Sequence, residues 1–501
     1  MSLIALIKRL QDIMRRDNGV DGDAQRLSQV VWILFLKVFD YKEQEGELKD
    51  DYKPVIPAGY RWRDWAEGKS AKEQMTGEEL IDFVNNRLFP ALRGNPVKSG
   101  KGETVVPFGS TSDRAMLVKN FMKDSYNYMK KGVELRQVIN LFNEVDLSDS
   151  RESHAFNDIY ENILKGLQSA GNAGEFYTPR ALTSFAVDHV DPSIGEKVAD
   201  FTSGTGGFLV DALRHMEYKI QAGDVKSQNR LQTAVEGIEW KPLPYMLCTT
   251  NLLLHGIEVP NIINGDTFMV KKYSDIVEKD RVNVIVMNPP YGGVSSKADQ
   301  ETFPSDIRTS ETADLFVAYI INRLKTKGRA AVVLPDGFLF GTDNAKVAIK
   351  KKLLKECSLH TVIRLPQSVF SPYTSIATNI LFFDKSGPTF ETWFYRMDMP
   401  EGYKHFNKTR PILREHMKPI DEWWNNRAEI KDAEGDTYKA RKYGIDEIRD
   451  NGYNIDLCGY PTKEEEILSP TETMDRFVER REILERQMDE KLDAIKKLLE
   501  G

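Results

Sequence analysis

A chain of 501 residues is too long for one hydrophobic core and predicts about three domains. Hydrophobic residues make up 41% of it, but no run approaches the roughly 20 consecutive apolar residues of a membrane helix, which argues against a membrane-spanning protein. The formal net charge is −7, whereas a protein that grips nucleic acid unaided is usually basic, so any nucleic-acid surface is a local patch or a partner supplies most of the phosphate contacts.

The three cysteines, Cys248, Cys357 and Cys458, are far apart and show no metal-ligand spacing. This pattern argues against zinc and against a disulfide framework, and it favours a reducing compartment. Met1–Leu10 contains apolar residues but no apolar segment followed by a small-residue cleavage site, so no signal peptide is expected. We therefore expect a cytoplasmic protein without a bound metal.

The first part of the chain, residues 1–168, lacks the alternation of strands and predicts an all-α domain. Leu27–Phe39 is nearly all apolar, which indicates a helix buried in a bundle or an interface. Helical periodicity returns at Met116–Met129, Leu135–Phe142 and Phe156–Leu167.

At about residue 170 the pattern changes, and strands alternate with helices up to residue 386. Such alternation predicts a mostly parallel sheet covered by helices on both faces. The seven expected strands are Lys197–Phe201, Thr233–Glu239, Asn261–Asn264, Val282–Met287, Ala330–Leu334, Thr361–Leu365 and Thr378–Phe383. The expected helices are Ala181–Val187, Gly207–Gln221, Pro242–His255, Asp314–Leu324 and Lys346–Glu356.

After residue 415 the sequence predicts a polar, irregular segment, followed from Thr471 by a charged helix. Phe477, Leu484 and Met488 belong to an apolar stripe on that helix. The stripe fits either a helix that lies on its own domain or one that docks on another subunit. Lys350-Lys351-Lys352 forms a local basic cluster, for which a solvated helix face is favoured over a nucleic-acid contact.

Asn288-Pro289-Pro290-Tyr291 directly follows the strand expected at Val282–Met287 and so lies at a strand's carboxyl end, where open α/β sheets bind ligands. The prolines stiffen the turn and leave carbonyls free to accept, the asparagine adds a side-chain carbonyl, and the tyrosine offers a flat face. This set predicts a socket for a planar group that carries an exocyclic amino group. A rigid turn without a ligand is the alternative.

The segment Asp200-Phe201-Thr202-Ser203-Gly204-Thr205-Gly206-Gly207-Phe208 follows the first expected strand and opens a helix. Its glycines allow a sharp turn and a close approach to a ligand. Leu209 stands where a dinucleotide fingerprint requires glycine, so a pyrophosphate site is less favoured. Glu239 and Asp266 end the second and third strands. Each alone suits a helix cap or a turn, but acids at three successive strand ends, followed by Asn288 at the fourth, predict one ligand-binding edge.

The glycine loop resembles the Asp-Pro-x-x-Gly-Thr-Gly-Gly loop of methyltransferases that use S-adenosylmethionine, although it departs at Phe201 and Ser203. Asn-Pro-Pro-Tyr resembles the catalytic motif of amino-methyltransferases. The Gly-Glu-Phe-Tyr-Thr-Pro segment at 174–179 comes first in the chain, the glycine loop second and Asn-Pro-Pro-Tyr third, which is the order of adenine amino-methyltransferases of the gamma class. With its helical amino-terminal domain, the chain resembles the modification (M) subunit of type I restriction–modification systems over most of its length, most strongly from about 170 to 385.

The resemblance implies an α/β fold with a Rossmann-like S-adenosylmethionine-dependent methyltransferase core, built on a mostly parallel seven-stranded sheet. It implies a helical domain at 1–168, a catalytic domain at 169–415, and at 416–501 an irregular segment with an amphipathic helix for subunit docking. The catalytic residues would be Asn288, Pro289, Pro290 and Tyr291, with Phe370, otherwise an ordinary core residue, as a candidate for stacking on the substrate base. The cofactor-binding residues would be Glu175, Phe176, Tyr177, Thr178, Asp200, Thr202, Ser203, Gly204, Thr205, Gly206, Gly207, Glu239 and Asp266. Thr178 is also expected to cap the helix that Pro179 begins.

The implied reaction is N6 methylation of an adenine flipped out of double-stranded DNA. The chain after the core shows no shaped module for reading bases, so recognition is expected from a separate specificity (S) subunit. A restriction (R) subunit would supply the nuclease, and a second M subunit is expected in the complex. The alternatives are a stand-alone defence methyltransferase, an RNA or protein-glutamine amino-methyltransferase, and a cofactor-binding scaffold. The loop Gly292–Thr312 either touches DNA or covers the site.

Overall fold

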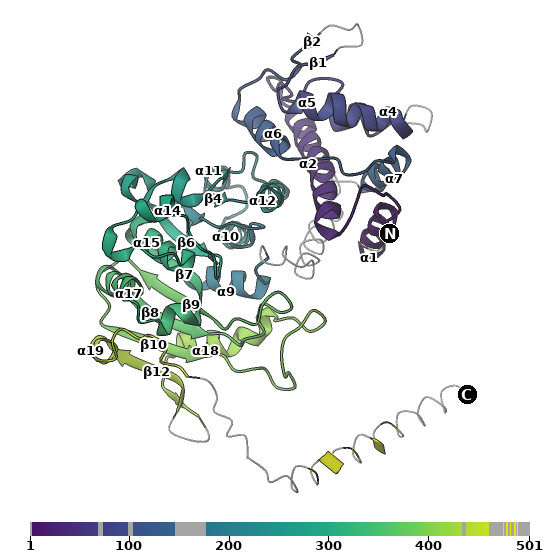
Figure 1. Cartoon of the computed structure of the whole chain (residues 1–501). Helices are drawn as coiled ribbons and strands as arrows, with labels where there is room; N and C mark the ends of the chain where they lie inside the picture. Colours follow the sequence, from purple (N-terminus) through teal and green to yellow (C-terminus); the bar gives the residue numbers. More distant parts are fainter. Residues whose placement is uncertain are drawn as a thin grey trace. The chain divides into compact units, whose positions relative to one another are not determined.

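The computed structural model describes residues 3–68, 74–98, 104–145, 177–432 and 437–459, together with residues 474, 477, 478, 481, 485, 486 and 488 (Figure 1). The chain divides into two compact units, Met1–Gly459 and Tyr460–Gly501. Within the described part, no helix combines the length and apolar character needed to cross a membrane.

The amino-terminal region is helical, as expected, and is centred on α2 (Asp23–Glu47). Residues of this helix are buried on every side, and Phe35 stacks on Phe121 with ring centroids 3.6 Å apart. The prediction of a buried helix at Leu27–Phe39 is therefore confirmed. The other elements are α1 (Leu3–Met14), α3 (Trp62–Trp65), α4 (Gly77–Asp82), the π-helical turn η1 (Phe83–Leu88), α5 (Phe89–Leu92), α6 (Asp113–Lys123) and α7 (Gly132–Asn143).

Two details of this region differ from the prediction. A short antiparallel pair, β1 (Val97–Lys98) and β2 (Thr104–Val105), means that the region is not entirely α. The helix expected to continue to Met129 ends at Lys123, because the side chain of Gln29 bonds the segment that follows, accepting from the Tyr128 N–H at 2.9 Å. The helix expected at Phe156–Leu167 lies outside the described residues.

The described sheet of the second region has ten strands in the order β11-β12-β10-β8-β9-β7-β6-β3-β4-β5. Five neighbouring strands, from β5 to β7, are parallel, whereas β9 is antiparallel to both β7 and β8. The bounds are β3 (Val198–Asp200), β4 (Val235–Glu239), β5 (Ile262–Asn264), β6 (Val282–Met287), β7 (Leu324–Pro335), β8 (Ser358–Arg364), β9 (Thr378–Asp384), β10 (Glu391–Arg396), β11 (Ile430–Lys431) and β12 (Tyr438–Gly444).

The expected number of seven strands is therefore wrong for this sheet. Each expected strand has a counterpart, but β10, β12 and β11 extend one edge, and β12 and β11 lie in the segment predicted to be irregular. Ala440 is the one fully buried residue of β12, which otherwise carries half-exposed or exposed lysine, arginine and tyrosine. An edge strand of this composition lacks the apolar alternation on which strand prediction depends.

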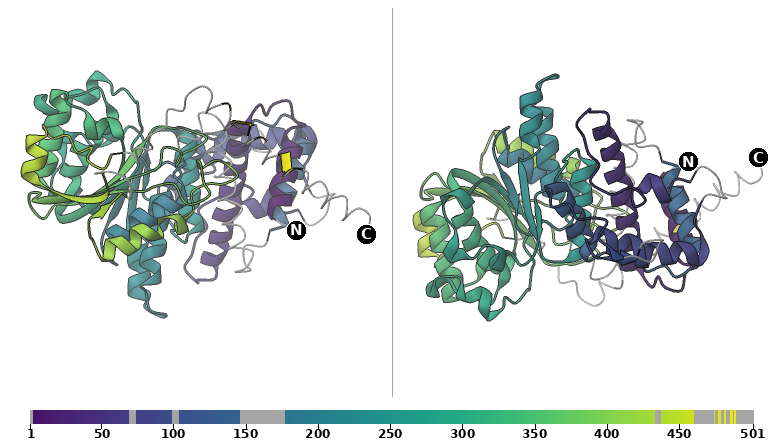
Figure 2. Two further views of the ribbon diagram at one scale, coloured as in Figure 1. Left: turned by 90° about the horizontal axis from the view of Figure 1, so that it is seen from below. Right: turned by 90° about the horizontal axis from the view of Figure 1, so that it is seen from above.

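Helices cover both faces of the sheet (Figures 1 and 2). Along β6, Val284 and Val286 belong to one hydrophobic cluster, and Ile285 and Met287 to another, since successive side chains of a strand point to opposite faces. The first face packs against α9 (Arg180–Val190), α10 (Gly207–Tyr218), α12 (Pro242–Leu254) and α18 (Lys418–Asn425), and the second against α15 (Thr312–Arg323), α17 (Asn344–Glu356) and α19 (Ile445–Asp450). The shorter helices are α11 (Val225–Leu231), α13 (Thr267–Val270), α14 (Lys297–Glu301) and α16 (Asp336–Phe340).

The chain that follows β12 is tied to the carboxyl end of β8. The guanidinium of the buried Arg364 pairs with Asp456 at 2.5 Å and Asp336 at 3.3 Å, and it donates to the carbonyl of Gly459 at 3.2 Å. Beyond residue 470, the seven described residues are helical and exposed, including Phe477 and Met488. The docking role of this helix stays a prediction.

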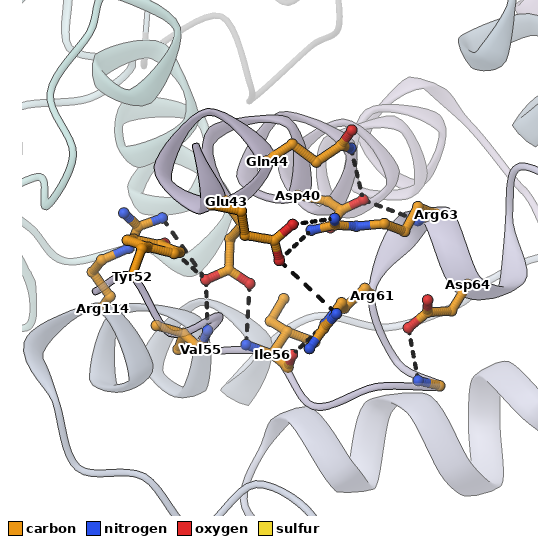
Figure 3. Close-up of polar contacts among 12 residues, drawn as sticks. Asp40, Glu43, Gln44, Tyr52, Val55, Ile56, Arg61, Arg63, Asp64 and Arg114 are labelled. Atoms are coloured by element: carbon orange, nitrogen blue, oxygen red, sulfur yellow. Dashed lines mark hydrogen bonds and ion pairs between the residues drawn. The ribbon is translucent and has the colours of Figure 1, made fainter. Parts of the chain in front are cut away.

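A buried carboxylate organises the amino-terminal region. Glu43, fully buried on α2, accepts from the N–H groups of Val55 at 2.6 Å and Ile56 at 3.2 Å, and from the Tyr52 hydroxyl at 3.1 Å (Figure 3). Burial and the neighbouring Glu43 charge raise the pKa of Tyr52 to about 12. The segment that follows α2 has no helix or strand around Val55 and Ile56, and Glu43 supplies the acceptors for its N–H groups.

Glu43→Ala should lower the free energy of unfolding of this region by about 2–4 kcal/mol, because buried N–H groups lose their acceptor. The midpoint of urea denaturation, followed by tryptophan fluorescence, measures the loss. Glu45→Ala, on the exposed side of the same helix, is the matched control and should change stability by less than about 0.5 kcal/mol. Equal midpoints for the two variants would contradict the role given to Glu43.

Candidate active site

A cavity of about 560 Å³ opens at the carboxyl ends of the parallel strands. It is lined by these residues of the sequence prediction: Tyr177, Thr178, Asp200, Thr202, Ser203, Gly204, Thr205, Gly207, Glu239, Asp266, Asn288, Pro289, Pro290, Tyr291 and Phe370. Gly206 shapes the loop without lining the cavity, and Glu175 and Phe176 lie outside the described residues. Segments far apart in the sequence therefore meet in one site.

The glycine loop turns sharply between β3 and α10. Gly204 and Gly206 have φ values of +52° and +80°, a region that favours glycine. A Cβ atom on Gly206 would lie 2.8 Å from the sulfur of Cys248 on α12. The glycines are thus required both by backbone conformation and by the close packing of α12 behind the loop.

Two buried carboxylates face the loop. Asp200 accepts from the Thr202 N–H at 3.0 Å, and burial, together with the nearby Glu239 charge, raises the pKa of Asp200 to about 8. Glu239 accepts from the N–H of Gly204 at 2.9 Å through one oxygen and from the N–H of Lys241 at 2.9 Å through the other. Carboxylate oxygens of this kind can accept from ligand hydroxyls as well as from backbone N–H groups.

Asp266 follows β5, the strand beside β4, so the acids at or just after the ends of β3, β4 and β5 lie along one line of strand ends. It caps α13 by accepting from the Phe268 N–H at 2.8 Å, and burial raises the pKa of its carboxyl. The Asp299 charge adds to that rise, so the loop after Asn-Pro-Pro-Tyr brings a second carboxyl group near this end of the cavity.

The Asn-Pro-Pro-Tyr turn is held from both sides. Thr202 donates its hydroxyl to the Asn288 carbonyl at 3.3 Å, and the Asn288 amide donates to the Thr178 hydroxyl at 3.3 Å. The Tyr291 hydroxyl donates to the side-chain oxygen of Asn288. The expectation that Thr178 caps a helix is wrong: α9 begins at Arg180 with Pro179 at the cap position, and the Thr178 hydroxyl serves Asn288 instead.

Phe370 faces Tyr291 edge-on, with ring centroids 6.3 Å apart and planes at 82°. It is only 4% exposed, so it lines the cavity as part of a packed wall. Tyr373, three residues further, also lines the cavity and is 39% exposed. The two rings therefore stand at different depths beside the Asn-Pro-Pro-Tyr turn.

The loop Gly292–Thr312 folds back on itself. Backbone bonds join Ser295 to Ser310 at 2.9 Å and Thr312 to Gly293 at 3.1 Å, and the buried Phe303 packs edge-on against Phe268. Its first half lines the cavity. The question left open by the sequence is thus partly answered, because this loop forms a wall of the site.

Several lining residues were missed by the sequence analysis. Trp240 is 70% exposed and directly follows Glu239, so its place beside an expected ligand was a usable signal. Lys241, Thr267 and Phe268 closely follow predicted residues, and Phe316 lies on α15. Ser295, Ser296 and Asp299 belong to the loop Gly292–Thr312, and Tyr373 reaches the cavity through loop closure, for which the sequence carries no comparable pattern.

Gly206→Val should weaken binding of S-adenosylmethionine strongly, because the new side chain meets Cys248 and the backbone at φ +80° resists substitution. Isothermal titration calorimetry measures the affinity. Gly109→Ala is the control, since a Cβ atom there meets nothing within 4 Å. Wild-type affinity in a folded Gly206→Val variant would show that the loop conformation is not needed for binding.

Comparisons with known proteins find sequence families, a curated relative and solved structures that are similar to this chain. A family described as N-6 DNA methylase matches residues 151–467, and one described as HsdM N-terminal domain matches residues 3–142. The type I restriction enzyme EcoEI methylase subunit of Escherichia coli is 50% identical over 460 residues, which cover 91% of this chain and 90% of that protein.

Two solved structures are also similar. A Vibrio vulnificus YJ016 modification subunit assigned to a type I restriction enzyme has a TM-score of 0.76 at 38% identity, covering 89% of this chain and 92% of that one. A chain from a structural study of complex assembly and conformational transition in a type I restriction–modification system has a TM-score of 0.78 at 31% identity, covering 99% and 98%. The chain therefore belongs to the family of type I restriction–modification methylase subunits, which are S-adenosylmethionine-dependent N6-adenine DNA methyltransferases.

Proposed function

We propose that the cavity binds S-adenosylmethionine along the glycine loop and a flipped-out adenine at the Asn-Pro-Pro-Tyr turn. The observation that carries this proposal is the single cavity in which Asp200, Glu239 and Asp266 lie together with Asn288 and Tyr291. One end is rich in carboxylates, and the other has amide and carbonyl acceptors beside aromatic rings. This division matches a cationic cofactor at one end and a planar amine at the other.

The cofactor half fits S-adenosylmethionine by its donor set. The buried Asp200 suits the positively charged methionine end, Glu239 suits the ribose hydroxyls, and Asp266 suits an amino group on the adenine ring. We also propose that Glu175, Phe176, Tyr177 and Thr178 bind the cofactor. When bound, S-adenosylmethionine supplies an activated methyl group.

The base half fits the amino group of adenine. In a duplex this group is buried by pairing, so the base must leave the stack to reach the cavity. Tyr291 would stack on the base, with Phe370 at the opposite wall, and the side-chain oxygen of Asn288 and the carbonyl of Pro289 would accept from the amino hydrogens. The side-chain oxygen of Asn288 has two lone pairs, so it could accept from the base while the Tyr291 hydroxyl still donates to it.

These acceptors direct the nitrogen lone pair at the methyl carbon and suit the positive charge that develops on nitrogen. S-adenosylmethionine, held by Asp200, Glu239 and Asp266, would supply the methyl group to this nitrogen, and its sulfur would keep the electron pair of the carbon–sulfur bond. The nitrogen then loses one proton to solvent. The rate gain comes mainly from positioning, and no cysteine takes part, since Cys248 lies behind the loop as a buried thiol.

We further propose that this chain works as the modification subunit of a type I complex on double-stranded DNA. A specificity subunit would select the sequence, a restriction subunit would cut, and a second M subunit would complete the methylase. The similarity to the EcoEI methylase subunit and to the chain from a type I assembly supports this. We propose 1–168, 169–415 and 416–501 as its functional divisions, the last for docking. The three buried free thiols support a cytoplasmic location.

Asn288→Ala should lower methyl transfer to DNA by about 100-fold or more, because an acceptor for the amino group is lost in the transition state. Tyr291→Ala should also abolish transfer. Both should keep wild-type affinity for S-adenosylmethionine in calorimetry. Asn261→Ala, on an exposed residue outside the cavity, is the matched control and should retain full activity. A large loss of cofactor affinity in either active-site variant would contradict the roles assigned here.

Cofactor affinity should rise with pH and level off above about 8. Without ligand the Asp200 carboxyl, with its pKa raised to about 8, is largely protonated at neutral pH, and a cationic ligand favours the ionised form. Binding at pH 7 should therefore release a proton. Calorimetry at pH 7 in buffers of different ionisation enthalpy measures that release, and Asp200→Asn should abolish it. Proton release that persists in Asp200→Asn would assign the effect to another group.

A further inference from the structure

We propose that the basic loop, residues 401–411 after β10, contacts the DNA phosphates that flank the flipped adenine. This proposal rests on the proposed function and names a surface by which the M subunit itself grips its substrate. The loop carries Lys404, Lys408 and Arg410, all exposed, against one acid, Glu401. It adds a positive patch to a chain whose net charge is −7.

The topology places this loop at the active-site edge of the sheet. β10 is parallel to β8, with Arg396 opposite Arg364, so both strands end at the same edge. β8 leads into the segment 365–374, which carries Phe370 and Tyr373 to the cavity wall, and β10 leads into the basic loop. The connections that follow these two neighbouring strands thus leave the sheet at the same edge.

A direct contact joins the two connections. The Phe406 N–H donates to the hydroxyl of Ser368 at 2.8 Å, and the Phe406 ring is 1% exposed. Ser368 is two residues from Phe370 in the cavity wall. The basic loop is therefore anchored on the segment that would face the target base.

The tip of the loop is a turn that the Asn407 side chain stabilises, and Arg410 on this turn is exposed. The side-chain oxygen of Asn407 accepts from the N–H groups of Thr409 at 3.0 Å and Arg410 at 2.9 Å. The Arg410 guanidinium lies 4.1 Å from the centre of the Tyr403 ring, which holds it in place. Within the described residues, neither Lys404 nor Arg410 forms an ion pair with a carboxylate. These charges remain available for phosphates.

The cavity itself does not offer that attraction. Its lining includes Asp200, Glu239, Asp266 and Asp299, with Lys241 as the one lysine or arginine among the described lining residues. DNA phosphates are repelled by these carboxylates, so DNA that delivers a base to the cavity needs cations at the cavity rim. The basic loop supplies them on the side of Tyr291, Phe370 and Tyr373.

The lysines of the basic cluster on α17, Lys350-Lys351-Lys352, already have contacts within the protein. Lys350 is buried and donates to the carbonyls of Leu339 at 3.0 Å and Gly341 at 2.8 Å, Lys346 pairs with Asp314 at 3.4 Å, and Lys352 pairs with Glu356 at 2.5 Å. Lys350 and Lys352 thus serve the fold, so the expected solvated helix face is wrong for the buried Lys350, whereas Lys351 and Lys355 on the same helix are exposed. The basic loop is thus the stronger candidate.

The test uses the complex of the full chain with the specificity subunit encoded beside it, and a DNA fragment that the unaltered complex methylates. Lys404→Gln/Arg410→Gln should weaken DNA binding on the order of tenfold and reduce the slope of log Kobs against log salt by about 2, roughly 0.9 per lost phosphate contact. Affinity for S-adenosylmethionine should not change. The matched control is Lys226→Gln/Arg230→Gln on α11. This helix leads into the amino end of β4, whereas the cavity lies at the carboxyl ends of the parallel strands, so the control should behave as wild type.

Three results would overturn the proposal. The first is an unchanged salt slope in a loop variant that still binds cofactor. The second is an equal change in the control. The third is loss of the specificity subunit from the loop variant on size-exclusion chromatography, which would make the loop an assembly surface. Failure of the unaltered complex to methylate any DNA would count against the proposed function instead, so the two proposals fail separately.

Discussion

The parallel register of four adjacent strands is the constraint on which the site depends. Asp200 pairs with Gly237, and Glu239 with Asn264, so the strands β3, β4 and β5 end within a residue or two of one another, and β6 runs beside β3 in the same direction. Side chains that are 88 residues apart in the sequence, such as Asp200 and Asn288, are thereby brought to one cavity. The helices on both faces leave this edge open, so the polar groups at the ends of these strands line the cavity.

Burial then sets the chemistry of that edge. Asp200 and Glu239 lie close together in a site that solvates charge poorly. Ionising Asp200 there costs free energy, and the raised pKa of Asp200 reflects this cost. A ligand with a positive charge relieves it, whereas a second anion would add to it. The same reasoning explains why the acidic cavity requires cations elsewhere on the molecule or its partners before DNA can approach.

The parts predicted from sequence are those that local patterns determine. β6 was predicted because Val282–Met287 is buried on both faces, and the glycine loop because its positive φ angles require glycine. β12 was missed because an edge strand rich in lysine and arginine shows no apolar alternation. The true partner of Thr178 is Asn288, 110 residues away, and no local signal distinguishes that bond from a helix cap. Asp299 and Tyr373 reach the cavity through loop closure, which depends on packing of residues such as Phe303 and Phe406 against distant segments.

The central claim is that one cavity transfers a methyl group to adenine in DNA chosen by a partner. The most direct test is transfer of label from methyl-tritiated S-adenosylmethionine to unmethylated DNA, followed by digestion to nucleosides, with this chain alone and with the specificity protein encoded beside it. The account predicts labelled N6-methyladenine only when both proteins are present. Label on another base, or transfer to DNA by this chain alone, would contradict it.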